Sequence, residues 1–351
     1  MKDKFSILIL GAFNLGALEH NFVRGFQHLG HQVHCLDIQT PVLENRKTLL
    51  DKIYFKILPT HFYIQINKTA LELTQKLRPD VILIFKGMEL FVETIEELQS
   101  YTKLLCNYNP DHPLEIYSEG AGNTNILNSL KFYDIHFSYA QNITKKLQLH
   151  TNKLCYTVPF GYDENLVNQY SKHINRQLNQ NFFAFIGAYD NERAKKLSLL
   201  QNPHLNIYGN SEWKNRNPFN NYLQKHFQQK ALYHQEYAQI SANSLGVLNF
   251  LRHQNLVEHS HNMRTFEVPA FGGLLIADRT EEQQEFFEEN KEAIFFNNID
   301  ELKEKLLFLH QNTANIPKMK QAALKRSINS GYSYLDRSKK LLDIFMTVLL
   351  E

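Results

Sequence analysis

A chain of 351 residues with 43% hydrophobic and 21% charged residues has a globular composition and exceeds what one hydrophobic core usually supports. Its 38 Lys and Arg against 36 Asp and Glu, with no basic run interleaved with aromatic residues, argue against a nucleic-acid partner. Three distant cysteines, Cys35, Cys106 and Cys155, indicate neither a disulfide framework nor a zinc site, which favours a reducing, cytoplasmic environment.

The chain opens with MKDKFSILILGAF, in which lysines precede an apolar run as they do in a signal peptide. No small-residue cleavage site follows, and Glu19, His20 and Arg24 come soon after, so we interpret the run as a buried first strand. No apolar stretch approaches the roughly 20 residues that cross a bilayer. Any membrane contact is therefore expected to be peripheral, at the inner face of the membrane.

Short apolar runs alternate with longer amphipathic segments, which is typical of α/β proteins whose parallel strands are connected by helices. In the first half we expect strands at 5–10, 33–37, 80–85, 103–109, 134–139 and 154–158. In the second half we expect strands at 182–187, 205–209, 245–250, 273–278 and 293–296. A polar stretch before residue 180 is the expected linker, so the sequence predicts Rossmann-like domains at 1–170 and 180–331.

The last segment, 332–351, carries Leu335, Leu341, Leu342, Phe345, Val348 and Leu349 on one broad apolar face. This spacing predicts a helix that needs a surface to pack against. We expect it to pack back on the N-terminal domain.

The most informative motif is HSHNMRTFEVPAFGGLLIADRTEEQQEFFEENKEAIFF, residues 259–296. It resembles the donor-binding region of the CgeB-like glycosyltransferases and, more broadly, of the glycogen-synthase-type group. In that group an acidic residue at a helix start precedes a glycine-containing turn and an apolar strand, and 266–276 fit this register without a gap. The resemblance implies the GT-B fold, in which two Rossmann-like domains with parallel sheets face a central cleft.

The resemblance also assigns residues to a nucleotide-sugar site. It implies that Glu267 is an active-site acid that holds the nucleotide ribose, while Arg264, Asn262 and the backbone amides of Met263 and Arg264 bind the diphosphate. Free amides at a helix start and a planar guanidinium both suit phosphate oxygens. The alternative is a solvated helix start with a capping Asn and ordinary surface charges.

One residue departs from the glycogen-synthase-type pattern. That group carries a second glutamate eight residues before the position of Glu267, and this chain has His259 there, with Glu258 out of register. The departure leaves open whether the anomeric configuration is retained or inverted. His259 and His261 are either phosphate contacts or bystanders in a polar loop.

A second stretch, FFAFIGAYDNERAKKLSLL, resembles the first strand and helix of the same donor domain. Gly187 would let a ligand approach the backbone, and Arg193 would point at the diphosphate or pair with Asp190 or Glu192 on the helix surface. In the following IYGNSEW, Tyr208, Gly209 and Trp213 are expected to wall the nucleobase, although core packing is an equal alternative for Tyr208.

In the first half, GAFNLG after the first strand is neither a dinucleotide fingerprint nor a P-loop. By resemblance to GT-B enzymes, Gly11, Asn14 and Gly16 would touch donor phosphate or acceptor. Asp111 follows a strand and is the expected base that deprotonates the acceptor hydroxyl, or else a turn former between two prolines. Nearby alternatives are Lys86, His112, Glu119 and the loop 120–122.

These observations predict a nucleotide-sugar-dependent glycosyltransferase whose donor carries an unknown base, with UDP, GDP and dTDP all open. The acceptor is a hydroxyl of a glycan, a lipid-linked molecule or a protein. No Asp-x-Asp flanked by apolar residues and no His or Cys cluster suggests a metal, so we expect metal-independent transfer without a cofactor. Alternatives are a GT-B epimerase or phosphorylase, or a non-catalytic envelope- or spore-associated binding protein.

Overall fold

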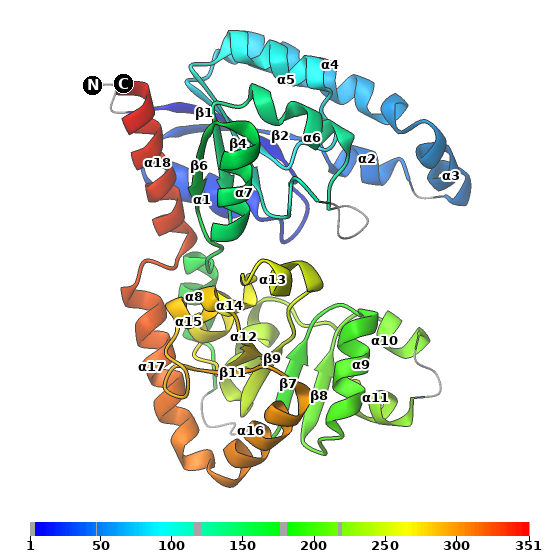
Figure 1. Cartoon of the computed structure of the whole chain (residues 1–351), viewed down its shortest axis with the longest axis vertical. Helices are drawn as coiled ribbons and strands as arrows, with labels where there is room; N and C mark the ends of the chain where they lie inside the picture. Colours follow the sequence, from blue (N-terminus) through cyan, green and yellow to red (C-terminus); the bar gives the residue numbers. More distant parts are fainter. Residues whose placement is uncertain (1–3, 47, 116–120, 176–180, 217–219, 351) are drawn as a thin grey trace. The chain divides into compact units, whose positions relative to one another are not determined.

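The computed structural model describes residues 4–46, 48–115, 121–175, 181–216 and 220–350. The chain divides into two compact units, one formed by 1–159 with 334–351 and the other by 160–333 (Figure 1). The border at Pro159 precedes the linker expected from the sequence, and part of that polar stretch forms helix α8 of the second unit. Residues 176–180 of the expected linker lie outside the described residues.

The first unit is built on a parallel six-stranded sheet with the order β2-β1-β3-β4-β5-β6. Its strands are β1 (Ser6–Gly11), β2 (Gln32–Asp37), β3 (Val81–Phe85), β4 (Leu104–Asn109), β5 (Ile135–Ser138) and β6 (Leu154–Thr157). The inner strands β3, β4 and β5 are buried at every position, because helices cover both faces of the sheet. The edge strands β2 and β6 are partly exposed, and their sequences are less uniformly apolar.

The helices of this unit are α1 (Glu19–His28), α2 (Thr40–Glu44), α3 (Leu49–Ile57), α4 (Pro59–Leu77), α5 (Val92–Leu98), α6 (Thr124–Ser129), α7 (Gln141–Thr151) and α18 (Tyr334–Leu350). Short 3₁₀ turns follow α5 at Gln99–Tyr101 and α6 at Leu130–Phe132. Within the described part of the chain, no helix has both the length and the apolar character needed to span a bilayer.

The final helix α18 packs against α1 (Figure 1). Its Phe345 is fully buried and contacts Phe26 of α1 and Phe137 of β5 at ring-centroid distances of 6.3 and 6.0 Å. The two helices approach closely at Gly25, where a β-carbon would come within 2.1 Å of the Ser338 hydroxyl. A side chain larger than hydrogen at position 25 would therefore push the helices apart.

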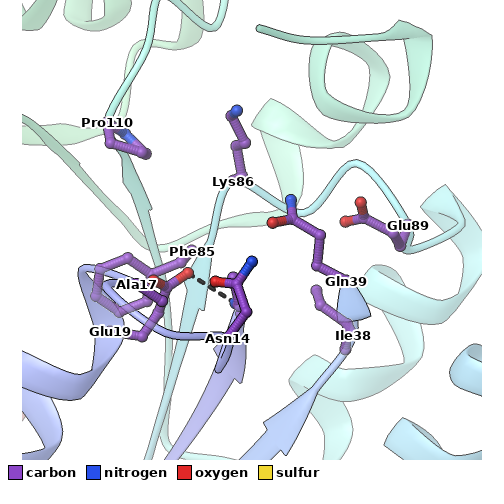
Figure 2. A pocket seen from close by; sticks show the side chains of 11 residues that line it. Asn14, Ala17, Glu19, Ile38, Gln39, Phe85, Lys86, Glu89 and Pro110 are labelled. Atoms are coloured by element: carbon purple, nitrogen blue, oxygen red, sulfur yellow. Dashed lines mark hydrogen bonds between the residues drawn. The ribbon is translucent and has the colours of Figure 1, made fainter. Parts of the chain in front are cut away.

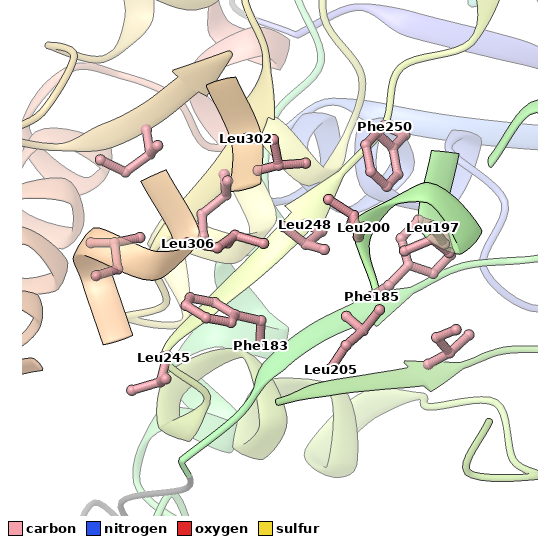
Figure 3. Close-up of a cluster of buried hydrophobic side chains, with 14 of the residues drawn as sticks. Phe183, Phe185, Leu197, Leu200, Leu205, Leu245, Leu248, Phe250, Leu302 and Leu306 are labelled. Atoms are coloured by element: carbon pink, nitrogen blue, oxygen red, sulfur yellow. The ribbon is translucent and has the colours of Figure 1, made fainter. Parts of the chain in front are cut away.

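The second unit is built on a parallel five-stranded sheet with the order β11-β10-β9-β7-β8. Its strands are β7 (Phe183–Ile186), β8 (Leu205–Tyr208), β9 (Gly246–Asn249), β10 (Leu275–Asp278) and β11 (Ala293–Phe296). Large apolar side chains from these strands and the covering helices form one core (Figure 3). Phe183, Phe185 and Leu248 of the sheet lie there with Leu302 and Leu306 of α16.

The helices of the second unit are α8 (Glu164–Ser171), α9 (Asn191–Leu200), α10 (Glu212–Asn215), α11 (Asn221–His226), α12 (His234–Asn243), α13 (His253–Val257), α14 (Arg264–Ala270), α15 (Glu281–Phe286), α16 (Ile299–Gln311) and α17 (Ile316–Asn329). A 3₁₀ turn at Thr313–Asn315 precedes α17.

The two sheets share one strand order. In each, the first strand of the unit lies between its second and third strands, so successive connections leave the first strand in opposite directions. Open α/β sheets bind ligands at such a switch point, outside the carboxyl ends of the strands. Ligand sites are therefore expected after β1 and β3 in the first unit and after β7 and β9 in the second.

Candidate functional site

Two glycines shape the carboxyl end of β7 and β8. A β-carbon at Gly209 would lie 2.2 Å from the carbonyl oxygen of Gly187, so the two loops can meet only because residue 209 has no side chain. The indole nitrogen of Trp213 donates a hydrogen bond of 2.9 Å to the same carbonyl. The structure therefore brings Gly187 and Gly209 together. Without side chains at these two positions, a ligand can come close to the backbone at this edge of the sheet.

Arg264, the first residue of α14, lies against this edge. A β-carbon at Gly187 would come within 3.2 Å of a terminal guanidinium nitrogen of Arg264. Gly187 and Arg264 come from sequence segments more than 70 residues apart, and the sequence placed both at the donor site. Their proximity makes Gly187 the residue that leaves room for the guanidinium.

Arg193 occupies the first turn of α9 and is buried, and its Nε donates to the carbonyl of Phe250 at 3.3 Å. Burial, and after it the positive charges of Arg264 and Arg252, lower its pKa to about 10. The alternative of a surface ion pair with Asp190 does not hold in the structure. Asp190 instead caps α9, and its carboxylate accepts backbone hydrogen bonds from Glu192 and Arg193.

We call Arg193, Arg252 and Arg264 the arginine cluster. Within the described part of the chain, none of the three forms an ion pair at 4.0 Å or less. Arginine cannot release its proton at neutral pH, so the charge of the cluster persists. An arrangement of this kind attracts an anion with several oxygens, such as a diphosphate.

Glu267 lies one turn into α14 and is partly covered. The hydroxyl of Tyr237 on α12 donates a hydrogen bond of 3.2 Å to its carboxylate. Burial raises the pKa of Glu267, while Arg264 and the Tyr237 hydroxyl act in the opposite direction. The carboxylate is thus fixed in direction by Tyr237 and held beside a positive charge, an arrangement able to accept hydrogen bonds from ribose hydroxyls.

The loop before α14 is locked by side chains. Asn262 and Asn249 exchange amide hydrogen bonds of 2.9 and 3.0 Å, which joins the loop to the end of β9. This pairing uses one amide N–H and the side-chain carbonyl of Asn262. The Asn262 side chain therefore fixes the position of the loop. Met263 precedes the helix with an exposed side chain.

His261 anchors the same loop from beneath. It is fully buried, its Nδ1 lies 2.6 Å from the carboxylate of Glu282, and its Nε2 accepts the amide N–H of Phe160 at 3.3 Å. Since Nε2 is an acceptor, Nδ1 carries the proton that is donated to Glu282. His259, at the position of the missing family glutamate, is exposed and has a left-handed φ of 50°.

The expected nucleobase wall differs from the structure at Trp213. Its ring is 1% exposed and packs edge-on against Phe185 and Tyr189, so no face is left for a base. Tyr208 is buried as well, which matches the core alternative. Tyr189, which the sequence did not single out, retains partial exposure beside these loops.

The first unit holds a pocket of about 190 Å³ at its own switch point (Figure 2). It is lined by Gly11, Ala12, Asn14, Ala17, Glu19, Ile38, Gln39, Phe85, Lys86, Glu89 and Pro110. Gly11 and Asn14, two of the expected ligand contacts, line this pocket. Gly16 does not line the pocket and instead forms an exposed turn with φ of 83°.

Two buried carboxyl groups face this pocket, and neither was identified from the sequence. Glu19 accepts the amide N–H of Ala12 at 2.8 Å, and burial raises its pKa. A β-carbon at Gly11 would lie 2.6 Å from its carboxylate, so Gly11 makes room for Glu19. Burial raises the pKa of Glu89 to about 7, against the opposing effects of Lys86 and Gln39.

Asp111 forms an ion pair of 2.7 Å with Lys86, and its backbone amide donates to the Asn109 side chain at 2.9 Å. Lys86 holds a left-handed φ of 61°, a backbone strain that is concentrated at functional sites in proteins. His112 is buried. Glu119 and Gly120 lie outside the described residues.

Comparison with protein families matches residues 191–343 to a family described as glycosyl transferase-like. A comparison with curated proteins gives no match. Among solved structures, sucrose-phosphate synthase from Thermosynechococcus elongatus matches with a TM-score of 0.71 at 11% identity over 99% of both chains. The chain has the GT-B fold.

Other GT-B structures extend this likeness. A glycosyltransferase from Rickettsia africae matches with a TM-score of 0.63 at 15% identity over 99% of both chains. Anabaena HepE in complex with UDP and glucose matches with a TM-score of 0.63 at 11% identity over 98% of this chain and all of that one. The match of residues 191–343 to the glycosyl transferase-like family supports a glycosyltransferase activity.

Proposed function

We propose that this glycosyltransferase binds the diphosphate of its nucleotide-sugar at the arginine cluster of the second unit. The observation that carries the proposal is the position of Arg264 over Gly187, next to the buried Arg193, without an ion-pair partner for either in the described residues. A diphosphate would neutralise the positive charges of these two guanidinium groups. The attraction is strong there because the groups are partly shielded from water.

The ribose is proposed to contact Glu267. Its carboxylate is held by Tyr237 and lies on the same short helix as Arg264, so one ligand can reach both groups. UDP is the first nucleotide to test, because Anabaena HepE carries UDP on the same fold. Asn262 and Met263 are proposed to act by fixing the shape of the loop that carries Arg264. Tyr189, a partly exposed aromatic residue two positions after Gly187, is the proposed contact of the nucleobase.

The acceptor is proposed to bind at the pocket of the first unit, with its hydroxyl deprotonated there. Asp111 stays the proposed base, and Glu89 is a second carboxyl group in the same region. Replacing Asp111 with Asn should lower kcat by about 100-fold or more and leave nucleotide affinity unchanged, if Asp111 is the base. An equal loss in Glu89→Gln, with full activity in Asp111→Asn, would transfer the role to Glu89.

We further propose that the chain is a CgeB-like bacterial enzyme of the cytoplasm that glycosylates envelope material, and that it needs no metal. The register of residues 266–276 supports the subfamily. Metal independence is tested by transfer assays with EDTA and with added magnesium. Activity that EDTA abolishes and magnesium restores would contradict it.

The donor site is tested by thermal shift with UDP, GDP, dTDP, CMP and ADP. We expect one nucleotide to raise the melting temperature of the wild type and to have little effect on Arg264→Ala and Glu267→Ala. Glu281→Ala, which removes an exposed carboxylate from α15, is the matched control and should respond like the wild type. Equal shifts in all four proteins would place the nucleotide elsewhere.

A donor alone distinguishes transfer from epimerisation. The protein is incubated with the UDP-sugar that binds best, without acceptor, and the sugar is analysed by NMR. We expect its configuration to persist, because epimerisation needs no acceptor and transfer does. Conversion of the sugar to its epimer would show that the protein is an epimerase and would contradict the proposed sugar transfer.

A further inference from the structure

Helix α3 of the first unit exposes an unusual amount of apolar surface. Leu49, Leu50 and Ile57 are 74%, 77% and 68% exposed, and Ile53 and Tyr54 of the same helix are exposed as well. We call these five side chains the α3 face. Soluble proteins scatter exposed apolar residues singly, whereas contiguous apolar patches mark interaction sites.

The residues of the α3 face follow helical spacing. Positions 49, 53 and 57 are four apart, and positions 50 and 54 fill the adjacent row, so the five side chains share one side of the helix. The exposed Leu43 of α2 and Leu58 and Ile64 near the start of α4 extend the apolar surface along the chain. Figure 1 shows α3 at the outer end of α4, away from the sheet of its unit.

Folding of the unit does not explain this surface. Among the α3 residues whose burial is described, none is fully buried, and Phe55 is the one that packs against the core cluster. The helix begins with a capping box between Thr48 and Asp51, which stabilises its first turn locally. Tyr54 contacts His61 and Phe62 of α4 at ring-centroid distances of 5.7 Å, whereas the aliphatic side chains of the α3 face stay exposed.

The charge of this segment narrows the choice of partner. Residues 40–64 carry four basic residues, Arg46, Lys47, Lys52 and Lys56, against two acidic residues, Glu44 and Asp51. The resulting net charge of +2 equals that of the whole 351-residue chain. Basic residues next to an apolar helix face are typical of segments that lie in the interface of an anionic membrane.

We propose that the α3 face docks the protein on a lipid surface that contains anionic headgroups, with its apolar side chains inserted among the lipids. A second copy of the chain fits less well, because a two-fold contact through this segment would bring its basic residues together. An anionic lipid surface attracts the same residues and covers the apolar ones. The proposal concerns the location of the protein and does not depend on the nucleotide site.

The test is co-sedimentation of the full chain with vesicles of phosphatidylcholine, with and without phosphatidylglycerol. We expect binding to the anionic vesicles, and a decrease of about tenfold or more in affinity for the double variant Leu50→Ser with Ile57→Ser. The matched control is Leu307→Ser with Phe308→Ser on α16, two side chains that are also more than half exposed. The control should bind like the wild type.

The salt dependence of vesicle binding and the oligomeric state of the protein distinguish an anionic lipid surface from a second copy of the chain. Binding to anionic vesicles should weaken as the salt concentration rises, because exposed charges are screened. Equal losses in both double variants, or no vesicle binding by the wild type, would overturn the proposal. So would a wild-type dimer in analytical ultracentrifugation that the α3 variant, and not the control, converts to monomer.

A fluorescent reporter separates insertion from misfolding. The native Trp213 is buried in the core of the second unit, so a tryptophan introduced by Leu50→Trp reports on α3. We expect its emission to shift to shorter wavelength with anionic vesicles, and the nucleotide-induced thermal shift of all variants to match that of the wild type. An emission unchanged by vesicles would contradict insertion.

Discussion

The guanidinium of Arg264 occupies the space that a side chain at Gly187 would fill, with only 3.2 Å between its terminal nitrogen and a β-carbon built there. Gly187→Ala should therefore displace Arg264 and weaken nucleotide binding by about 5- to 20-fold. The new carbon would also lie 3.2 Å from the ring of the buried Phe185, so we expect a small loss of stability beside the loss of affinity. Isothermal titration calorimetry with the nucleotide measures the loss.

A coupling experiment distinguishes this cause from general destabilisation. In an Arg264→Ala background, Gly187→Ala should have a much smaller effect on affinity, because the displaced side chain is already gone. If the losses of binding free energy in the two single variants add in full in the double variant, Gly187 does not act through Arg264.

The Tyr237 hydroxyl should tune the acidity of Glu267. Its hydrogen bond favours the ionised carboxylate, so Tyr237→Phe should raise the pKa of Glu267 further above its ordinary value. If ribose requires the ionised form, nucleotide affinity falls as the pH is lowered, and in Tyr237→Phe the fall begins at a higher pH. Titrations across a pH series measure both curves, and superimposable curves would contradict this role.

Glu89 should make the protein less stable as the pH rises. Its pKa is raised by burial from 4.5 to about 7, so the folded state retains a proton that the unfolded state has released. The contribution of this proton to the free energy of unfolding is present in full below about pH 4.5. It is lost as the pH rises through about 7, and the total loss is roughly 3 kcal/mol. Urea unfolding at several pH values should show this decline in the wild type.

The variant Glu89→Gln supplies the comparison. Its unfolding free energy should decline less over the same pH range, with a remainder that Glu19 contributes, because burial raises the pKa of Glu19 as well. A decline equal to that of the wild type would show that Glu89 is ionised in the folded protein at neutral pH.

The contact between Gly25 of α1 and Ser338 of α18 should be sensitive to a single methyl group. Gly25→Ala should destabilise the first unit by about 1–3 kcal/mol, because the new carbon would overlap the Ser338 side chain. Ser338→Gly should recover part of the loss, whereas Gln27→Ala on the exposed side of α1 should have little effect. Thermal unfolding measures all three, and a failure of Ser338→Gly to rescue would contradict the direct contact.

The eleven strands of the described residues lie where the sequence predicts them, within one or two residues at each end. The reason is physical: strands covered on both faces, such as Val81–Phe85 and Leu104–Asn109, are continuous apolar runs that helices of a soluble protein seldom match. Apolar residues at helical spacing likewise predicted the final helix α18. The order of the strands was not contained in these local patterns.

The side-chain environment of the site was harder to predict. Trp213 is buried under the glycine loops, and Arg252, Glu19 and Glu89 join clusters whose members are distant in the sequence. Whether a side chain faces a ligand or the core depends on tertiary contacts that no local spacing reports. One signal was present in the sequence for Glu89, since it closely follows Gly87 after the apolar run 80–85, where a loop leaves a predicted strand.

The return of α18 to the first unit has a consequence for synthesis of the protein. The second unit is one continuous segment, 160–333, whereas the first unit requires residues 334–351 as well. A growing chain therefore presents all of the second unit before Phe345 has been translated, and Phe26 and Phe137 stay uncovered until then. The unit that begins first is completed last, so on the ribosome its aromatic core is the surface that needs protection from aggregation.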